Sequence, residues 1–582
     1  MWPAIPLFFK DSKMKKIFIL TTSILGLSTS SAFAQLSQTS DITQTGLTNN
    51  ATVDQTGGQE GISEIDQLGN TNLATVTQSE NSVGSVSFSV SANEADIDQT
   101  GNNQSASITQ VNEITPATGP TNSSTITQTE SGGVETSNAS ALAVGGFALE
   151  AISTQNGTGN IGIITQTNNG NLAFAEQNGE NNSSDIDQSG LNNRAILNEQ
   201  GFNFNLNGND NDSTITQTGD NNLARVDQDG DFLTSIIDQS GNDNRARVRG
   251  QNASNNFSSI LQSGDRNDAD VNDQGAEPGT ANIGSGNSSF IDQSGDDNKA
   301  ELNQTGDTNE SVITQLGSLD HANVEQTGDG NFSDVIQWGA GSNNKADVTQ
   351  SGDENDSLVD QGFAGDVRNT ATIVQNGNGN DSTVFQSFNN AGSDNTATIT
   401  QSGNDGFSNV DQGGGAFNVA TLTQAGDRNS SEIFQIGNGN DATVIQANAD
   451  NSSFVTQEGD DHVAYVDQTG VTGQSVFIDQ SGIQNDGNLI DDGDLNASEI
   501  LQIGTTNYAY VEQTSDSVNS RSEITQDGLS NHADVLQGSA DNLSTIFQDG
   551  DSNWATVTQS SSAGNISNIL QTGTNNTSTV TQ

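Results

Sequence analysis

The residues that recur most regularly in this chain are glutamines, whose side-chain amides each offer two hydrogen-bond donors and an acceptor. Between Gln293 and Gln582 their usual step is 11 or 12 residues, and Asp491 stands where one glutamine is expected. A buried amide without a partner costs about 1 to 3 kcal/mol, so a long series of them requires mutual hydrogen bonding. Amides stacked in register can donate to one another from strand to strand, as in cross-β structures. The spacing therefore indicates structural chemistry, in the form of hydrogen-bonded amide ladders.

Residues that could carry catalysis or bind a metal are few and scattered. His321 and His532 each precede an alanine on an expected outward face, and His462 takes a turn position otherwise held by asparagine. No nucleophile and base motif and no metal-ligand spacing surrounds them. We expect surface or turn histidines, with no catalytic residue, no cofactor and no metal ligand, and we interpret the chain as a protein that is not an enzyme.

Aspartates recur just after the repeated glycine. Coiling of the chain would stack them along one edge, about 5 Å apart, where like charges repel. Our main interpretation is a solvated surface that keeps the chain soluble before assembly. A second hypothesis is weak binding of divalent cations along these acidic turns, so that cations, salt or lower pH would trigger assembly. The aspartates are Asp220, Asp265, Asp296, Asp307, Asp353, Asp427 and Asp460.

The composition excludes several classes of protein. The 582 residues include 74 acidic and 15 basic ones, for a formal charge of −59. So few cations cannot neutralise a phosphate backbone, and we expect no nucleic-acid partner. The absence of cysteine excludes disulfides and thiolate metal sites. Apolar residues make up only 30%, which would predict disorder unless a repeat supplies another source of cohesion.

Such a repeat is present, and a fixed period takes precedence over bulk composition. Two half-repeats alternate in a unit of about 22 residues: Ser-x-Ile-x-Gln, as at 213–217, and Asn-x-Ala-x-Val-x-Gln, as at 222–228. Their period of two places the repeated residues on one strand face, and the Gly-Asp-x-Asn segments between them predict turns. The glutamines can form continuous ladders only if equivalent strands lie about 4.7 to 4.9 Å apart. We predict an all-β, two-sheet β-solenoid, cross-β-like, with Gln and Asn ladders.

The two ends and the interruptions of the repeat predict the domain organisation. A charged start, a short apolar stretch and small residues predict a secretory signal peptide cleaved after Ala34. Its removal leaves a net charge of −62, and no later segment is apolar enough to span a membrane. We divide the chain into an over-extended start at 1–13, the signal peptide at 14–34, repeats with irregular insertions at 35–200, repeats with loop insertions at 201–286, and a regular repeat block at 287–582.

The pattern resembles the curlin family, the subunits of the curli amyloid fibres of bacterial biofilms. The family's repeat is similar to Gln-x-Gly-x-x-Asn-x-Ala-x-x-x-Gln, and the likeness covers nearly the whole mature chain. The predicted structural ladder comprises Gln217, Gly219, Asn222, Ala224, Gln228, Gln239, Gln293, Gly295, Asn298, Ala300, Gln304, Gln315, Gln326, Gln548, Gly550, Asn553, Ala555, Gln559, Gln571 and Gln582.

The resemblance implies a secreted structural subunit that polymerises into extracellular, amyloid-like fibres, which mediate adhesion and aggregation in a biofilm matrix. It also implies a nucleator subunit and an outer-membrane export pore of the curli type as partners. The repeat continues to Gln582 without an atypical capping coil, and we therefore expect end-to-end self-association. The alternative is a monomeric secreted β-solenoid, either an adhesin or an ice-binding protein with outward threonine pairs.

Overall fold

The computed structural model describes residues 38–56, 61–80, 93–112, 122–129, 149–199, 209–251, 253–272, 285–339, 343–362, 368–386, 394–468, 473–481, 497–514 and 520–582. All regular structure in these ranges is β, in 43 strands. No helix that could cross a membrane occurs in them. The expected start at 1–13, the signal peptide at 14–34 and its cleavage site at Ala34 lie outside the described residues.

The chain divides into two compact units near residue 210. The first unit holds β1 (Thr39–Thr45), β2 (Asn50–Thr56), β3 (Ile62–Leu68), β4 (Leu73–Glu80), β5 (Glu94–Thr100), β6 (Gln104–Asn112), β7 (Ser123–Thr129), β8 (Leu149–Thr158), β9 (Ile161–Thr167), β10 (Leu172–Glu180), β11 (Ser183–Ser189) and β12 (Arg194–Glu199).

The second unit begins with β13 (Asp212–Thr218), β14 (Leu223–Gln228), β15 (Thr234–Ser240), β16 (Arg245–Gln251), β17 (Phe257–Gln262), β18 (Asp268–Asn272), β19 (Ser288–Gln293), β20 (Lys299–Thr305), β21 (Glu310–Gln315), β22 (His321–Thr327), β23 (Phe332–Gln337), β24 (Lys345–Ser351), β25 (Asp356–Gln361), β26 (Thr370–Gln375) and β27 (Asp381–Gln386). It continues with β28 (Thr396–Gln401), β29 (Phe407–Gln412), β30 (Val419–Gln424), β31 (Ser430–Ile436), β32 (Asp441–Gln446), β33 (Ser452–Glu458), β34 (Val463–Gln468), β35 (Ser475–Ser481), β36 (Ala497–Thr505), β37 (Tyr508–Gln513), β38 (Arg521–Leu529), β39 (His532–Gln537), β40 (Leu543–Asp549), β41 (Trp554–Gln559), β42 (Ile566–Thr572) and β43 (Thr577–Thr581).

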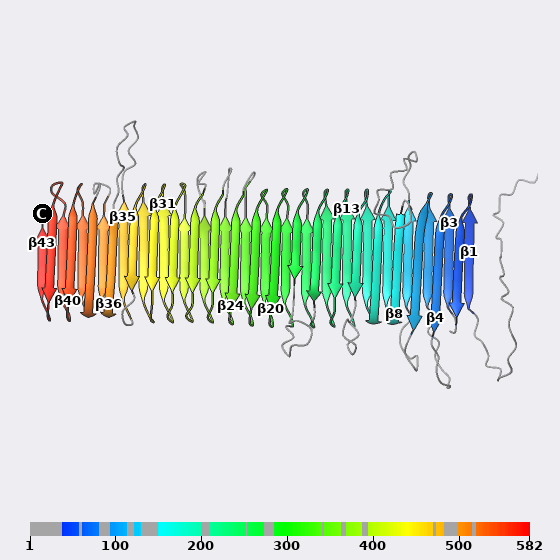
Figure 1. The fold of residues 1–582 in the computed structure, drawn as a ribbon, viewed down its shortest axis with the longest axis horizontal. Coiled ribbons are helices and arrows are strands. Elements are labelled where there is room, and N and C mark those ends of the chain that lie inside the picture. The colour runs from blue at the N-terminus through cyan, green and yellow to red at the C-terminus, as the bar shows by residue number, and fades with distance from the viewer. Residues whose placement is uncertain are drawn as a thin grey trace, which may run out of the picture. The chain divides into compact units, whose positions relative to one another are not determined.

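Each coil consists of one odd-numbered and one even-numbered strand, which belong to different sheets. Within each unit every strand pairs in parallel with the strand two places along the chain, so that β21 pairs with β23 and β22 with β24. Consecutive strands point in opposite directions because a turn separates them (Figure 1). The predicted two-sheet β-solenoid is confirmed.

The alternation of small or apolar residues with polar ones decides which side chains enter the core. In β21 the side chains of Ser311, Ile313 and Gln315 are buried, whereas Glu310, Val312 and Thr314 point outward. The pairing is in register, so that Ile313 lies beside Val335 of β23. One apolar residue per strand, with an alanine or serine, is all that each coil contributes to the apolar core, and the glutamines supply the rest of the cohesion.

The strict alternation of half-repeats ends between β34 and β36. Asp491, which stands where the sequence predicts a glutamine, lies outside the described residues. Gln468 of β34 donates to Gln502 of β36, at 3.2 Å. As a result the Ala-type half-repeat moves to the odd-numbered sheet, where Ala533 is buried, and the Ser-type half-repeat moves to the even-numbered one, where Ser522 is buried. Because both half-repeats end in the same glutamine, the ladders continue across the exchange.

Candidate functional site: the amide ladders and the turn edges

In the glutamine ladder of the odd-numbered sheet, an amide in the middle of the second unit uses both of its hydrogens. Gln293 Nε2 donates to Gln315 Oε1 at 2.8 Å, and Gln315 Nε2 donates to Gln337 Oε1 at 2.9 Å. The second hydrogen of Gln315 goes to the backbone oxygen of Lys299, at 3.0 Å, on the facing strand β20. Since all three glutamines are fully buried, each amide joins neighbouring coils and also joins the two sheets.

The even-numbered sheet carries a second ladder of the same geometry. Gln304 Nε2 donates to Gln326 Oε1 at 2.9 Å and to the backbone oxygen of Ser288 at 3.0 Å. Near the C-terminal end, Gln548 Nε2 donates to Gln571 Oε1 at 2.7 Å. Bonds of this kind between neutral amides are replaceable by water in an unfolded chain, but leaving one unmade in the core costs about 1 to 3 kcal/mol.

The structure places the predicted ladder residues in columns that run from coil to coil. The glutamine column of the odd-numbered sheet holds Gln217, Gln239, Gln293, Gln315, Gln559 and Gln582; that of the even-numbered sheet holds Gln228, Gln304, Gln326, Gln548 and Gln571. Buried alanine columns hold Ala224, Ala300 and Ala555, and the turns hold Gly219, Gly295, Gly550, Asn222, Asn298 and Asn553.

Asparagines form a third set of ladders where each turn enters the next strand. The backbone N–H of Asn298 donates to Asn267 Oδ1 at 2.9 Å, and Asn298 Nδ2 donates to the backbone oxygen of Gly317 at 2.9 Å. Asp320 and His462 occupy this position in two coils, and both are buried. The column therefore accepts a residue other than asparagine as long as its backbone N–H still reaches the preceding side chain.

Successive coils approach so closely at these turns that the first residue of the turn must be glycine. A Cβ atom built on Gly295 would lie 1.5 Å from the backbone oxygen of Gly317 in the next coil. At Gly219 the same atom would lie 2.1 Å from the oxygen of Gly241, and the φ of 106° also disfavours any other residue. These positions require glycine because the turns of successive coils touch backbone to backbone.

The aspartates that follow these glycines lie along two edges of the solenoid, and the expectation of a single edge is wrong. Asp265 and Asp296 follow odd-numbered strands, whereas Asp307 and Asp353 follow even-numbered ones, because each coil has one turn after each strand. Besides repelling one another, their carboxylates accept hydrogen bonds from the backbone. The N–H of Asp307 donates to Asp329 Oδ1 at 2.8 Å, and the N–H of Asp329 donates to Asp353 Oδ1 at 3.0 Å. Each carboxylate thus satisfies a backbone donor of the preceding coil.

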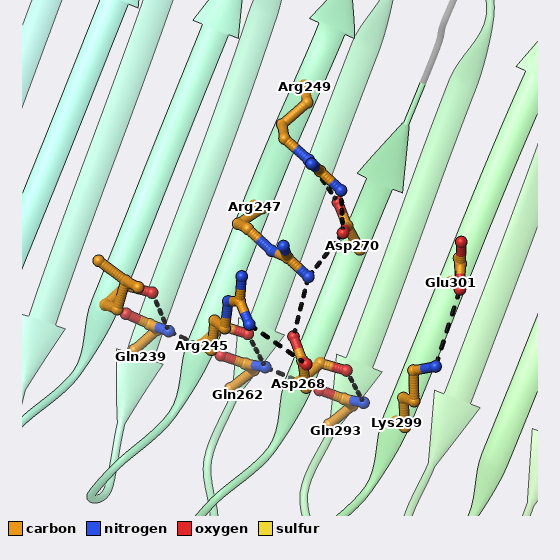
Figure 2. A network of polar contacts seen from close by, with 11 residues as sticks. Gln239, Arg245, Arg247, Arg249, Gln262, Asp268, Asp270, Gln293, Lys299 and Glu301 are labelled. Atoms are coloured by element: carbon orange, nitrogen blue, oxygen red, sulfur yellow. Dashed lines mark hydrogen bonds and ion pairs between the residues drawn. The ribbon is translucent and has the colours of Figure 1, made fainter.

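Most basic residues pair with acids of an adjacent coil. On the outer face of the even-numbered sheet, Arg245 and Arg247 of β16 reach Asp268 of β18, and Arg247 also lies 2.7 Å from Asp270 (Figure 2). Arg249 forms a bidentate contact with the same Asp270. Desolvation lowers the pKa of Arg247 despite these acids. At the turns, Arg266 with Asp297 and Arg428 with Asp450 make bidentate pairs, which lower the pKa of both aspartates.

The outer face of the odd-numbered sheet in the second unit carries carboxylates that are only half exposed. Burial raises the pKa of Asp334, Asp356 and Asp381, and the neighbouring carboxylate of Asp381 raises that of Asp356 further. Asp356 and Asp381 are direct in-register neighbours on β25 and β27. This face therefore holds like charges close together in a partly desolvated setting.

Two aromatic columns on the same face have no counterpart in the sequence analysis. Phe454, Phe477 and Tyr510 stack with ring centroids 5.1 Å apart. His532 lies between Tyr508 and Trp554, at 4.6 and 3.9 Å, and its Nε2 is 2.9 Å from Asp534 Oδ1. These residues share positions within their repeats, and aligning the half-repeats across the insertions would have brought them together.

Among the described residues, no group of three or more His, Asp or Glu side chains is placed so that it could hold a metal ion. The arrangement is thus a regular lattice of hydrogen bonds and ion pairs. Chemically, such a lattice can act as a template, because successive coils present to their neighbours ladder amides, polar turn side chains and open strand edges in the same arrangement.

Comparison with known families gives a result that fits this lattice. A family model described as the curlin-associated repeat matches residues 219–249, 283–306, 295–328, 320–352, 368–414 and 418–447. All six matches lie in the second unit. No curated protein matches the chain significantly.

Proposed function

The chain is a curlin-family protein, and from this premise we propose that it is a secreted structural subunit that polymerises end to end into extracellular, amyloid-like fibres of a biofilm matrix. The curlin repeats support a fibre subunit and a structural role. Adhesion and aggregation of cells would follow from the network that such fibres form.

The observation that carries the proposal is the constancy of the ladder. Most described coils of the second unit bond to the next through both glutamine columns, and the bonds Gln537 to Gln559 and Gln559 to Gln582 have the same geometry as those in the middle of the unit. Within the described residues, β42 pairs only with β40, and β43 only with β41. Their other edges offer a second copy the groups that every inner coil offers its neighbour.

The test is assembly of the purified chain from Gln35 to Gln582. We expect fibres that bind thioflavin and give a meridional reflection near 4.7 Å, the spacing of strands along a cross-β axis. A chain that remained a soluble monomer at high concentration would overturn the proposal and favour the monomeric adhesin.

A proline at the outer edge of β43 provides a sharper test of end-to-end assembly. The backbone groups of Asn576 and Gln582 bond toward β41, so by alternation those of Thr579 point to the open edge. Thr579→Pro removes one outward donor without breaking a bond to β41, and we expect it to slow elongation. Thr579→Val keeps the N–H and should elongate like the wild type.

Export is part of the same proposal. We expect cleavage after Ala34, passage through a curli-type outer-membrane pore, and nucleation by a separate subunit. N-terminal sequencing of material from the culture medium should begin at Gln35. Millimolar calcium should speed assembly by screening the two acidic turn edges, and sodium chloride at equal ionic strength should produce a similar effect.

A further inference from the structure

The outer face of the even-numbered sheet loses almost all its charge over four successive coils. The strands are β26, β28, β30 and β32, and we call their outward side the threonine face. Thr372, Thr398, Thr421 and Thr443 are direct in-register neighbours across it, and Thr400 lies beside Thr423 in a second column. Of its twelve outward residues, only Asp441 is charged.

The opposite side of the same coils has the reverse character. There the outward positions of β25, β27, β29 and β31 include Asp356, Asp360, Asp381, Asp411 and Glu432. Charge also returns at both borders of the threonine face, with Lys345 and Asp347 on β24 and Asp467 on β34. In a chain of formal charge −59, this is a surface on which two copies can approach without direct repulsion between carboxylates.

We propose that the threonine face pairs with the threonine face of a second copy of this chain, related by a two-fold axis. Rows of β-branched residues with little charge and without glycine or proline are the segments that interdigitate as dry interfaces between sheets about 10 Å apart. A two-fold contact brings each central threonine close to its own equivalent. The pairing joins solenoids side by side and does not depend on end-to-end assembly.

The size of the face sets the strength of the contact. Four strands about 4.8 Å apart and five residues long cover on the order of 300 Å², whereas a stable interface buries about 800 Å² on each partner. A single pair of copies is therefore a weak dimer. Copies held in line would repeat the contact many times, so the same face would bundle fibres through multivalency.

The absence of cysteine from the chain allows a clean test. Thr398→Cys places one thiol at the centre of the threonine face, and Thr383→Cys places one on β27, on the opposite side of the same coil. Both positions are partly exposed and outward. Under mild oxidation we expect a covalent dimer from Thr398→Cys and its near absence from Thr383→Cys. Equal cross-linking of the two variants would overturn the proposal.

A charge variant tests the same face without cross-linking. Thr398→Glu should abolish the concentration-dependent dimer seen by sedimentation, and Thr383→Glu should retain it. Unchanged sedimentation of Thr398→Glu would contradict the pairing. If the wild-type chain stays monomeric and adsorbs to ice, and Thr398→Glu loses this adsorption, the pairing is overturned and the threonine face is an ice-binding surface. Because the dimer is measured in solution, a failure of fibre growth and a failure of pairing are separate results.

Discussion

The backbone N–H of Asp320 donates to Oδ1 of Asn298 at 2.9 Å, which places an aspartate in a buried column of asparagines. Oδ1 of Asp320 in turn accepts from the N–H of Asn344 at 2.9 Å. The two residues differ in the second side-chain atom: Asn298 Nδ2 donates to the oxygen of Gly317, whereas a carboxyl oxygen can donate only when it carries a proton.

Asp320→Asn should therefore stabilise the protein. We expect the free energy of unfolding at neutral pH to rise by about 1 to 3 kcal/mol, because an amide always carries the N–H donor that this column uses, whereas a buried carboxyl must either stay charged or bind a proton. Urea unfolding followed by circular dichroism measures it. Asn298→Asp is the matched control and should destabilise; a loss of stability in Asp320→Asn would contradict the argument.

Gln315→Leu should be strongly destabilising. The change keeps the apolar bulk but leaves the Nε2 group of Gln293 and the Oε1 atom of Gln337 without their partner, at about 1 to 3 kcal/mol each. Thermal unfolding of the soluble chain measures the effect. Gln44→Leu, in the partly exposed strand β1, should cost much less, and equal losses at the two sites would show that the ladder is not the source of cohesion.

Gly295→Ala tests the backbone contact between turns. Its φ is not in the positive range, so the expected loss comes from the 1.5 Å approach of Cβ to the oxygen of Gly317. We expect a loss of about 1 to 3 kcal/mol or more, as for other overpacked sites. Gly538→Ala, whose Cβ would have no neighbour closer than 3.4 Å, should be nearly neutral. Similar melting temperatures for the two variants would refute the contact.

Ser333→Ala should be neutral or stabilising by about 1 kcal/mol, because the buried Oγ of Ser333 has no hydrogen-bond partner. The equivalent residue Ser289 donates to Gln304 Oε1 at 2.8 Å, so Ser289→Ala should lower stability. Chemical denaturation of both variants measures their free energies of unfolding. Equal changes at the two sites would contradict a stabilising role for the Ser289 hydrogen bond.

The stability of the solenoid should increase as the pH falls from 7 toward about 4. Burial raises the pKa of Asp356 and Asp381 above the ordinary value of 3.8, and the neighbouring carboxylate of Asp381 raises that of Asp356 further, so both bind protons more readily in the folded state. Keeping these two carboxylates charged lowers the stability of the folded state at neutral pH. This loss disappears as the pH falls through the raised pKa values and the carboxylates bind protons. Melting temperatures across this range measure it.

The double variant Asp356→Asn with Asp381→Asn should be more stable at pH 7 and respond less to acid. Asp450→Asn should instead lower the stability at pH 7, because Arg428 lowers the pKa of Asp450 and their ion pair is lost on substitution. A wild-type melting temperature that fell steadily from pH 7 to pH 4 would contradict the expected behaviour of the half-buried face.

The fold follows from the sequence alone because the repeat is local. The period of two within each strand, glycine and asparagine at the turns, and one glutamine per strand leave a stacked solenoid as the arrangement that pairs every buried amide. The half-repeat pattern groups Gln217, Asn222 and Gln228 in one unit, and in the structure they lie in β13, the turn that follows it and β14.

What depends on neighbours in adjacent coils required the tertiary structure. Insertions change the number of residues between equivalent strands, so only the folded chain reveals that Gln468 bonds to Gln502, that Arg247 meets Asp270, and that Thr398 lies between Thr372 and Thr421. The turn aspartates divide between two edges for the same reason. Local periodicity determines which way a side chain points, but the stacking of coils determines which side chain lies beside it.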